Sequence, residues 1–453
     1  MISSSPFPMS RAFLGTMAIV LLKTVFVPFC SPSCKIILMK LNPNSLLINS
    51  ERMRRDFEEL ARIGATTQGG VHRPALSEAH LEARRWFRDQ VLAGGLQFHT
   101  DSAGNHSAVL PCASPGAPSL LLGSHLDSVP DGGRFDGALG VLAALEALRV
   151  VKEAGFSLPV NLEAIDFTDE EGTLVGLLGS AAIAGKLSPQ DLLNPRGGRN
   201  ALLAALERAG LSEEGLLQAA RPPGSLAGYL ELHIEQGPRL VREKTQIGVV
   251  TAIVGIASYQ VSFVGRADHA GATSMQDRLD AAQGAAAFIL SARQITVEHF
   301  HGCVCNVGAA SFAPGAYNIV PARVELALEF RAPDAETFSR LESALLDSAQ
   351  EQAARSGLGL EIEFRGKHQP TVMESAVKVI CDAAADLGLS YIALPSGAGH
   401  DAQSLAGLCP VGMIFVPSEG GASHSPREYT PWEDCVNGAN VLLHSALKMA
   451  SSL

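Results

Sequence analysis

Residues 120–140 constrain the fold more than any other stretch, because they join an apolar run to a loop of acidic and imidazole side chains. They read LLLGSHLDSVPDGGRFDGALG, so that His125, Asp127 and Asp136 follow three leucines and are spread among glycines. The leucines predict the end of a buried strand, and residues 138–154 carry apolar side chains at the spacing of a helix. In α/β sheets ligands bind where strands end, so this loop is expected to hold a site.

His125 and Asp136 carry the imidazole nitrogen and carboxylate oxygen that a divalent metal ion accepts as ligands. They are too far apart in the sequence to share one face of a helix, so a folded loop must bring them together. Asp127 follows His125 by two residues and is placed to hold the ring by its second nitrogen. Taken alone, these residues are equally typical of a polar turn with a capping aspartate.

Two further predicted strands lead into side chains of the same kind. Residues 160–167 are followed by Glu170 and Glu171, and residues 230–237, which read LELHIEQG, contain His233. Adjacent glutamates point in different directions, so one can bind a metal while the other takes a proton from water. The alternatives are a solvated acidic turn for the glutamates and a buried core histidine for His233.

The order of the expected elements changes after residue 248. The sequence predicts strands at 259–264, 303–310, 323–331 and 360–364 and helices at 280–295 and 336–356. Strand–helix–strand repeated twice is the ferredoxin-like order. We therefore predict an α/β protein in which a mixed-sheet α/β/α catalytic domain, residues 45–248 and 366–453, contains an inserted ferredoxin-like α+β domain at 249–365. The apolar helix faces and an exposed strand edge of this insert suit a dimer contact.

Composition excludes some classes of partner. The length of 453 residues favours two domains. The net charge of −11 argues against a nucleic-acid partner, since binding phosphates requires clustered lysine and arginine. The eight cysteines form no Cys-x-x-Cys pair, so reduced thiols and a cytoplasmic location are expected.

Residues 1–44 are expected to be an N-terminal extension that is disordered or an artefact of the start site, because they show no periodic core-facing pattern. Residues 12–30 are mostly apolar, but Lys23 interrupts them and no clear cleavage site follows. A signal peptide or anchor within residues 1–38 is therefore the alternative, and membrane contact is not the expectation.

Six motifs, taken in order, resemble the amidase/hydantoinase/carbamoylase family of dinuclear metallohydrolases. They are His-x-Asp at 125–127 with Asp136, EEG at 170–172, LHIEQG at 232–237, ADHAG at 267–271, SGAGHD at 396–401 and SHSPRE at 423–428. The resemblance covers residues 45–450. The family includes N-carbamoyl-L-amino acid hydrolases, allantoate amidohydrolases and β-ureidopropionases.

The resemblance implies two divalent metal ions per subunit, zinc or manganese, for which cobalt or nickel can substitute. It also implies which residues bind them: His125 and His233 would hold one ion, Glu171 and His424 the other, and Asp136 would bridge the two. Related peptidases commonly have a carboxylate where this chain has His233, which favours the carbamoylase branch.

The same resemblance implies the remaining roles, and it implies that the insert at 249–365 is a lid that closes over the substrate as well as a dimerisation domain. Glu170 would be the general base, Asp127 would orient His125, and His269 would stabilise the oxyanion in the active site of the partner subunit of a homodimer. The substrate would be a small molecule with a carboxylate and a ureido or amide group. The residues implied for binding it are Asn318 and Arg331 at its carboxylate and Gln236 and His400 along the pocket.

The predicted reaction is metal-dependent hydrolysis of a linear amide or ureido C–N bond. The expected substrate is an N-carbamoyl-L-amino acid, which would give the amino acid, carbon dioxide and ammonia, or allantoate. The alternatives are a dipeptidase or aminoacylase of the same clan and a non-catalytic protein that binds a metal or a ligand. Thr173 to Val175 and Ser274 depart from the family's pattern, so the exact substrate stays open.

Overall fold

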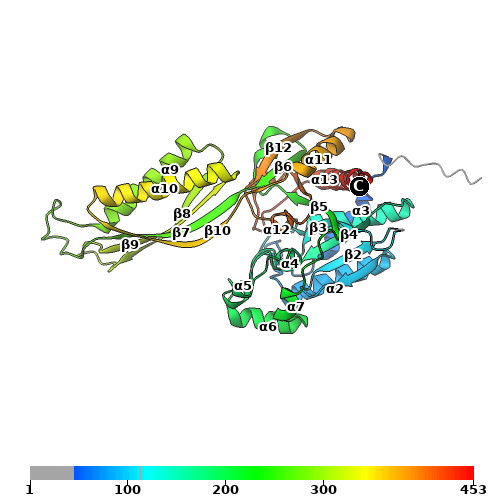
Figure 1. The fold of residues 1–453 in the computed structure, drawn as a ribbon, viewed down its shortest axis with the longest axis horizontal. Helices are drawn as coiled ribbons and strands as arrows, with labels where there is room; N and C mark the ends of the chain where they lie inside the picture. The colour runs from blue at the N-terminus through cyan, green and yellow to red at the C-terminus, as the bar shows by residue number, and fades with distance from the viewer. Residues whose placement is uncertain (1–44, 113, 453) are drawn as a thin grey trace, which may run out of the picture. The chain divides into compact units, whose positions relative to one another are not determined.

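The computed structural model describes residues 45–112 and 114–452, which form a mixed nine-stranded sheet and a separate four-stranded sheet (Figure 1). The expected extension at residues 1–44 lies outside the described residues. Within the described ranges, no helix has both the length and the apolar character needed to cross a membrane.

The nine-stranded sheet follows the order β1, β2, β4, β3, β5, β13, β6, β11, with β12 also paired to β6. The strands are β1 (Gln97–Thr100), β2 (His106–Leu110), β3 (Ser119–His125), β4 (Asn161–Phe167), β5 (Leu226–Ile234), β6 (Ile247–Ile253), β11 (Thr371–Val372), β12 (Tyr391–Ser396) and β13 (Val411–Val416). Strands β4, β3, β5 and β13 are neighbours and run parallel. Their carboxyl ends therefore meet at one edge of the sheet.

Helices cover both faces of this sheet. Successive side chains of a strand point to opposite faces, so each strand contributes apolar side chains to two cores. Leu120 and Leu122 of β3 belong to one buried core and Leu121 to another. The first core is formed with α1 (Ser50–Leu60), α2 (Glu78–Ala93), α3 (Ala138–Glu153), α11 (Glu374–Asp386) and α13 (Trp432–Ser451). The second includes residues of α4 (Leu178–Ile183), α8 (Arg239–Glu243) and α12 (Asp401–Leu405). The predicted mixed-sheet α/β/α architecture is confirmed.

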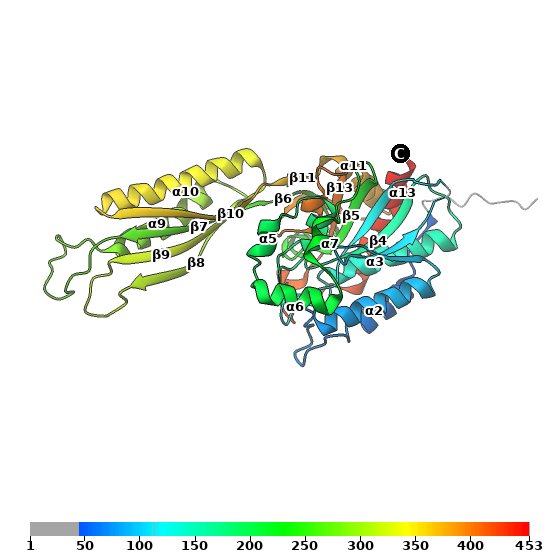
Figure 2. The same cartoon turned by 60° about the horizontal axis from the view of Figure 1, so that its bottom comes forward.

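The four-stranded sheet has the ferredoxin-like order of elements that the sequence predicts. Its elements are β7 (Gly255–Val264), α9 (Ala281–His299), β8 (Val304–Ala313), β9 (Arg323–Ala332), α10 (Ala335–Arg355) and β10 (Gly359–His368). The antiparallel strands lie in the order β10, β7, β9, β8. Helices α9 and α10 share a buried core with one face of this sheet (Figure 2).

Both edges of the inserted unit differ from the expected 249–365. Residues 249–253 belong to β6, where they pair with β11 and β12, and the antiparallel contact with β13 begins at Gly248 and Val249. Residues 366–368 extend β10 along β7. The pairing therefore assigns residues 255–368 to the four-stranded sheet and its helices.

Three short helices follow α4 in the segment that leads to β5. They are α5 (Pro189–Leu193), α6 (Arg199–Ala209) and α7 (Glu213–Leu217). A separate small core that includes Leu192, Leu202 and Leu216 holds them against Leu174 and Leu178. This packing fixes the chain that follows the two glutamates after β4.

Candidate metal centre

Side chains from four neighbouring strand ends converge at the edge where β3, β4, β5 and β13 finish. His125 ends β3, Glu171 follows β4, His233 lies near the end of β5, and His424 lies in the loop after β13. Asp136, in the loop between β3 and α3, lies among them. Their ligand atoms form two groups, each with all atoms within 4.8 Å of one another: His125, Asp136 and His233, and Asp136, Glu171 and His424.

Asp136 belongs to both groups because its two oxygens face different histidines. Its Oδ1 lies 3.5 Å from His125 Nε2 and 3.2 Å from His233 Nε2. Its Oδ2 lies 3.7 Å from Nε2 of His424, which is in turn 3.4 Å from Glu171 Oε2. A single carboxylate is thus placed to bridge two cations.

The two buried histidines are oriented by backbone carbonyls. His125 Nδ1 lies 3.1 Å from the carbonyl oxygen of Asp127, and His233 Nδ1 lies 2.9 Å from that of Ile234. A carbonyl oxygen only accepts hydrogen bonds, so each Nδ1 carries the hydrogen in the neutral ring. The lone pair of each Nε2 is then directed toward Asp136, which is the tautomer that a metal ion requires.

The charges of the cluster also fit a cation. Burial raises the pKa of Glu171 to about 8, and repulsion from Asp136 adds to this effect. Burial lowers the pKa of His233, but the charge of Asp136 outweighs it and brings the value to about 9. Protons on such groups offset the crowding of buried carboxylates, and divalent cations held between them would do the same.

Glu170 lies beside the first group without being part of it. Its Oε2 is 3.5 Å from His125 Nε2, and burial raises its pKa well above the ordinary value. The backbone N–H groups of Glu170 and Glu171 donate to the two carboxylate oxygens of Asp127, at 3.3 and 3.2 Å. Asp127 therefore fixes the glutamate turn with its carboxylate while its carbonyl holds His125.

Gln236 and His400 both lie next to the metal-ligand groups. Gln236 donates from Nε2 to Asp136 Oδ2 at 2.7 Å. His400 is buried, its ring centroid is 4.6 Å from that of His233, and its Nε2 lies 2.9 Å from Ser396 Oγ. Glu231, His233 and His400 form a third group of ligand-type atoms, but Nε2 of His233 already faces Asp136 and accepts the Gly137 N–H at 3.3 Å.

The implied substrate residues of the four-stranded sheet lie apart from these groups within the chain. His269 and Asn318 are exposed, and their loops are joined by a hydrogen bond from Ala270 N–H to the Asn318 carbonyl at 3.0 Å. Within residues 45–112 and 114–452, neither side chain contacts the ligand groups. Arg331 donates to the Gly397 carbonyl at 2.6 Å and pairs with Glu329 at 2.8 Å.

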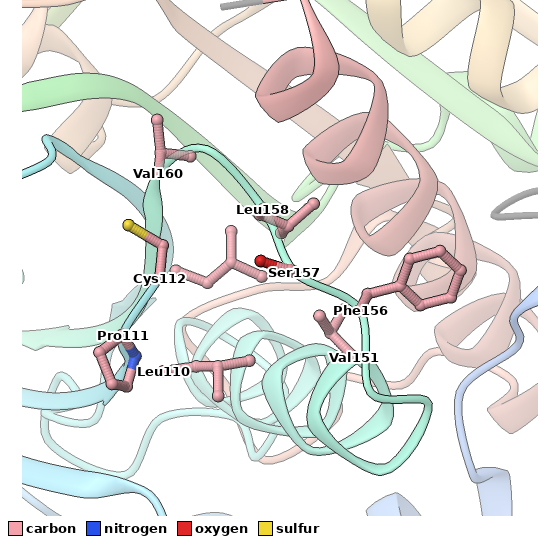
Figure 3. A pocket seen from close by; sticks show the side chains of 9 residues that line it. Leu110, Pro111, Cys112, Val151, Phe156, Ser157, Leu158 and Val160 are labelled. Carbon is pink, nitrogen blue, oxygen red and sulfur yellow. The ribbon is translucent and has the colours of Figure 1, made fainter. Parts of the chain in front are cut away.

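A cavity of about 300 Å³ lies near the amino end of β4, away from the strand ends that carry the ligand groups (Figure 3). Its lining is mainly apolar and includes Leu110, Val151, Phe156 and Leu162, with Cys112 at one side. It offers neither paired carboxylates nor imidazoles, so it provides no means of hydrolysing an amide.

Glu428 lies in the SHSPRE motif, but it is not among the site residues that the sequence predicts. Glu428 is buried, and its Oε1 accepts the backbone N–H groups of Phe135 and Asp136 at 2.8 and 3.1 Å. A glutamate four residues after His424 in a serine- and glycine-rich loop was the available signal, but such residues are normally solvated.

The chain is similar to known proteins over most of its length. The family model described as peptidase family M20/M25/M40 matches residues 121–448. An N-carbamoyl-L-amino acid amidohydrolase of Geobacillus stearothermophilus is 38% identical over 407 residues, which are 89% of this chain and 99% of that protein. A ureidoglycolate hydrolase of Arabidopsis thaliana is 34% identical over 418 residues, 90% of this chain and 88% of that protein. The crystal structure of an amidase of the hydantoinase/carbamoylase family from Burkholderia multivorans matches with a TM-score of 0.81 and 33% identity, covering 90% of this chain and 99% of that one.

Proposed function

Since the chain belongs to peptidase family M20/M25/M40, we propose that it is a metal-dependent hydrolase of a linear amide or ureido C–N bond. The observation that carries the proposal is the pair of ligand groups that share Asp136, with the carboxylate of Glu170 beside them. A complete set of ligands and a base is what hydrolysis needs, whereas a non-catalytic binding protein does not require the base.

Two ions would be held by the groups described above. His125 and His233 would hold the first, Glu171 and His424 would hold the second, and Asp136 would serve both. When bound, zinc or manganese ions polarise the scissile carbonyl and acidify a water molecule, which makes a poorly electrophilic ureido or amide carbon open to attack. Asp127 keeps the His125 ring and the glutamate turn in place for this purpose.

Glu170 is the general base in this proposal. Its position beside the ligand groups allows it to take the proton of the attacking water and to deliver it to the leaving nitrogen. Its buried setting supports this role, because a carboxylate with a raised pKa takes up a proton more readily than a solvated one and keeps it until the leaving nitrogen accepts it. His269 would stabilise the oxyanion that forms on the substrate carbonyl.

The substrate class we propose is an N-carbamoyl-L-amino acid, with allantoate or another ureido acid as the next candidate. The names of the relatives at 34–38% identity, N-carbamoyl-L-amino acid amidohydrolase and ureidoglycolate hydrolase, support ureido acids over dipeptides. Arg331, which donates to Glu329 and to the Gly397 carbonyl, would exchange Glu329 for a substrate carboxylate held by two parallel hydrogen bonds, and Asn318 would assist it. Gln236 and His400 would line the pocket.

A homodimer would complete the site. His269 and Asn318 have no contact with the ligand groups of their own chain in the described residues, so a second subunit is the source we propose. Leu290 and Val297 of α9 are 71% and 56% exposed, and Val304 of the edge strand β8 is 58% exposed. An apolar helix face beside an unpaired strand edge is a surface that a second copy of the chain can cover.

For the complete dimer we propose a cytoplasmic location, on the evidence of cysteine usage alone.

The function is tested by measuring hydrolysis of a panel of N-carbamoyl-L-amino acids, allantoate, ureidoglycolate and dipeptides with purified protein supplied with zinc or manganese. We expect release of ammonia from one or more ureido acids and loss of turnover after chelation, with recovery on adding metal back. Cleavage of dipeptides alone would replace the proposal with a peptidase, and full turnover by chelated protein would remove the metal from the mechanism.

A further inference from the structure

We propose that Glu428 is a positioning residue that ties the loop of Asp136 to the loop of His424 and thereby sets the affinity of the second metal site. The inference rests on the proposed function, because it concerns how two of its proposed ligands are held. It adds a residue that contributes no ligand atom and lies outside the set implied by the motifs.

Glu428 contacts both loops with one buried carboxylate. Its Oε1 accepts the backbone N–H groups of Phe135 and Asp136 at 2.8 and 3.1 Å. Ser423 Oγ lies between the two carboxylates, 3.1 Å from Oε2 of Glu428 and 2.8 Å from Oδ2 of Asp136, so its one hydrogen is shared between them. The carboxylate thus holds Asp136 by its backbone directly and by its side chain through Ser423.

The backbone of the Asp136 loop is shaped around this carboxylate. A Cβ placed on Gly133 would lie 1.9 Å from Cδ of Glu428, so only glycine allows the loop to approach so closely. Glu428 is only 3% exposed. Within the described part of the chain, its carboxylate forms hydrogen bonds with two backbone N–H groups and a hydroxyl and has no cationic partner. Backbone amides and a hydroxyl therefore satisfy it, which fits a residue whose task is to hold a loop.

His424 needs such support more than the other proposed ligands. The other four are buried or nearly buried, whereas the side chain of His424 is 51% exposed. Its φ of +52° is in the left-handed region, which a histidine adopts only when its surroundings impose it. Ser423 precedes it, and Glu428 N–H donates to the Ser425 carbonyl at 3.0 Å, so the loop turns back onto the Glu428 anchor.

Replacing Glu428 with alanine removes the link between the loops and leaves every proposed ligand atom in place. Residues that orient metal ligands typically change metal affinity or activity 10–100-fold when they are mutated. We expect Glu428→Ala to weaken one of two metal-binding steps by about 10–100-fold and to leave the other within about threefold. The weakened step is the second site, because Glu428 holds the loops of both Asp136 and His424 there, whereas the first site depends on Glu428 through Asp136 alone.

The test is calorimetric titration of metal-stripped, full-length protein with Mn²⁺, with the melting temperature of the metal-free protein recorded for each variant. Glu428→Gln should rescue most of the affinity, because its amide oxygen can accept the two N–H groups while its NH₂ donates to Ser423. Glu419→Ala, which removes an exposed carboxylate of the same segment, is the matched control and should bind Mn²⁺ like the wild type.

The outcomes separate the two proposals. Wild-type protein that binds no Mn²⁺ would overturn the proposed function together with this inference. Two binding steps in the wild type that Glu428→Ala leaves unchanged would overturn the role of Glu428 alone. If Glu428→Ala does not fold, Ser423→Ala carries the test, since it breaks the same link and keeps the backbone contacts; unchanged affinity there would also refute the inference.

Discussion

At the scale of single residues, Glu170 differs from the proposed metal ligands in its contacts. It lies beside His125 and belongs to neither group that shares Asp136. We expect Glu170→Gln to retain the metal content of the wild type and to lower kcat by about 10²–10⁴-fold, the usual contribution of a general base. Metal analysis and steady-state kinetics on the same sample check this, and a variant that loses its metal would indicate that Glu170 is a ligand.

Glu163 of β4 shows how a buried charge away from the site affects stability. Arg221 reaches its two oxygens at 2.5 and 2.9 Å, and Ser107 donates to it at 2.7 Å. Burial opposes the charge, but Arg221 outweighs it and holds the pKa of Glu163 below 4.5. Because the folded pKa is lowered, this pair stabilises the protein above pH 4.5, and the contribution is lost as the pH falls through the folded pKa.

Arg221→Met should therefore lower the free energy of unfolding at pH 7 by roughly 3–5 kcal/mol, since it leaves a buried carboxylate without its cation. This loss of free energy of unfolding should become smaller toward pH 4. Glu163 of the variant is then protonated and carries no charge that a cation must balance. Denaturant unfolding at both pH values measures it. Arg239→Met, which breaks an exposed pair with Glu243, should change stability by less than about 1 kcal/mol at either pH.

At the scale of elements, α3 is held against the sheet by a close approach at Gly140. A Cβ there would lie 2.4 Å from the Leu232 carbonyl of β5 and 2.8 Å from Cβ of Ser124 in β3. Helix propensity alone predicts that Gly140→Ala stabilises α3 by about 1 kcal/mol. We expect the reverse, a loss of about 1–3 kcal/mol, because the contact lies against backbone that cannot move aside. Thermal or denaturant unfolding decides the sign, with Gly366→Ala, where a Cβ meets nothing within 4 Å, as the control.

The elements that the sequence predicts are those with a strong pattern. The alternation of Val324, Leu326, Leu328 and Phe330 predicts β9, and these side chains are buried in one core. Helices α3, α9 and α10 lie within a few residues of the expected ranges. Strands β1, β2, β6, β11 and β12 are not predicted from the sequence. Short strands, edge strands and the apolar run of β6 beside the insert have no distinctive period. The boundaries of the insert differ from the predicted ones for the same reason.

At the scale of the whole molecule, the shared active site remains a prediction that mixing can test. Co-expressed His269→Ala and Glu170→Gln chains would form heterodimers in which one of the two sites has an intact base and an intact partner histidine. Random assembly should then give about a quarter of wild-type activity, although each variant alone is inactive. Activity no higher than that of the separate variants would place His269 in the site of its own chain or outside the mechanism.

The amino-acid sequence by itself determined the fold class, the family and the list of candidate ligands, because each depends on local patterns and motif order. Tertiary structure decided that the two oxygens of Asp136 face separate histidine sets, that the carbonyl of Asp127 holds His125, and that Glu428 joins two loops. These contacts link residues far apart in the chain, and Glu428 is 292 positions from Asp136. Spacing in a sequence cannot specify which distant backbone amides a carboxylate will meet, since parallel strands and their loops bring them together only on folding.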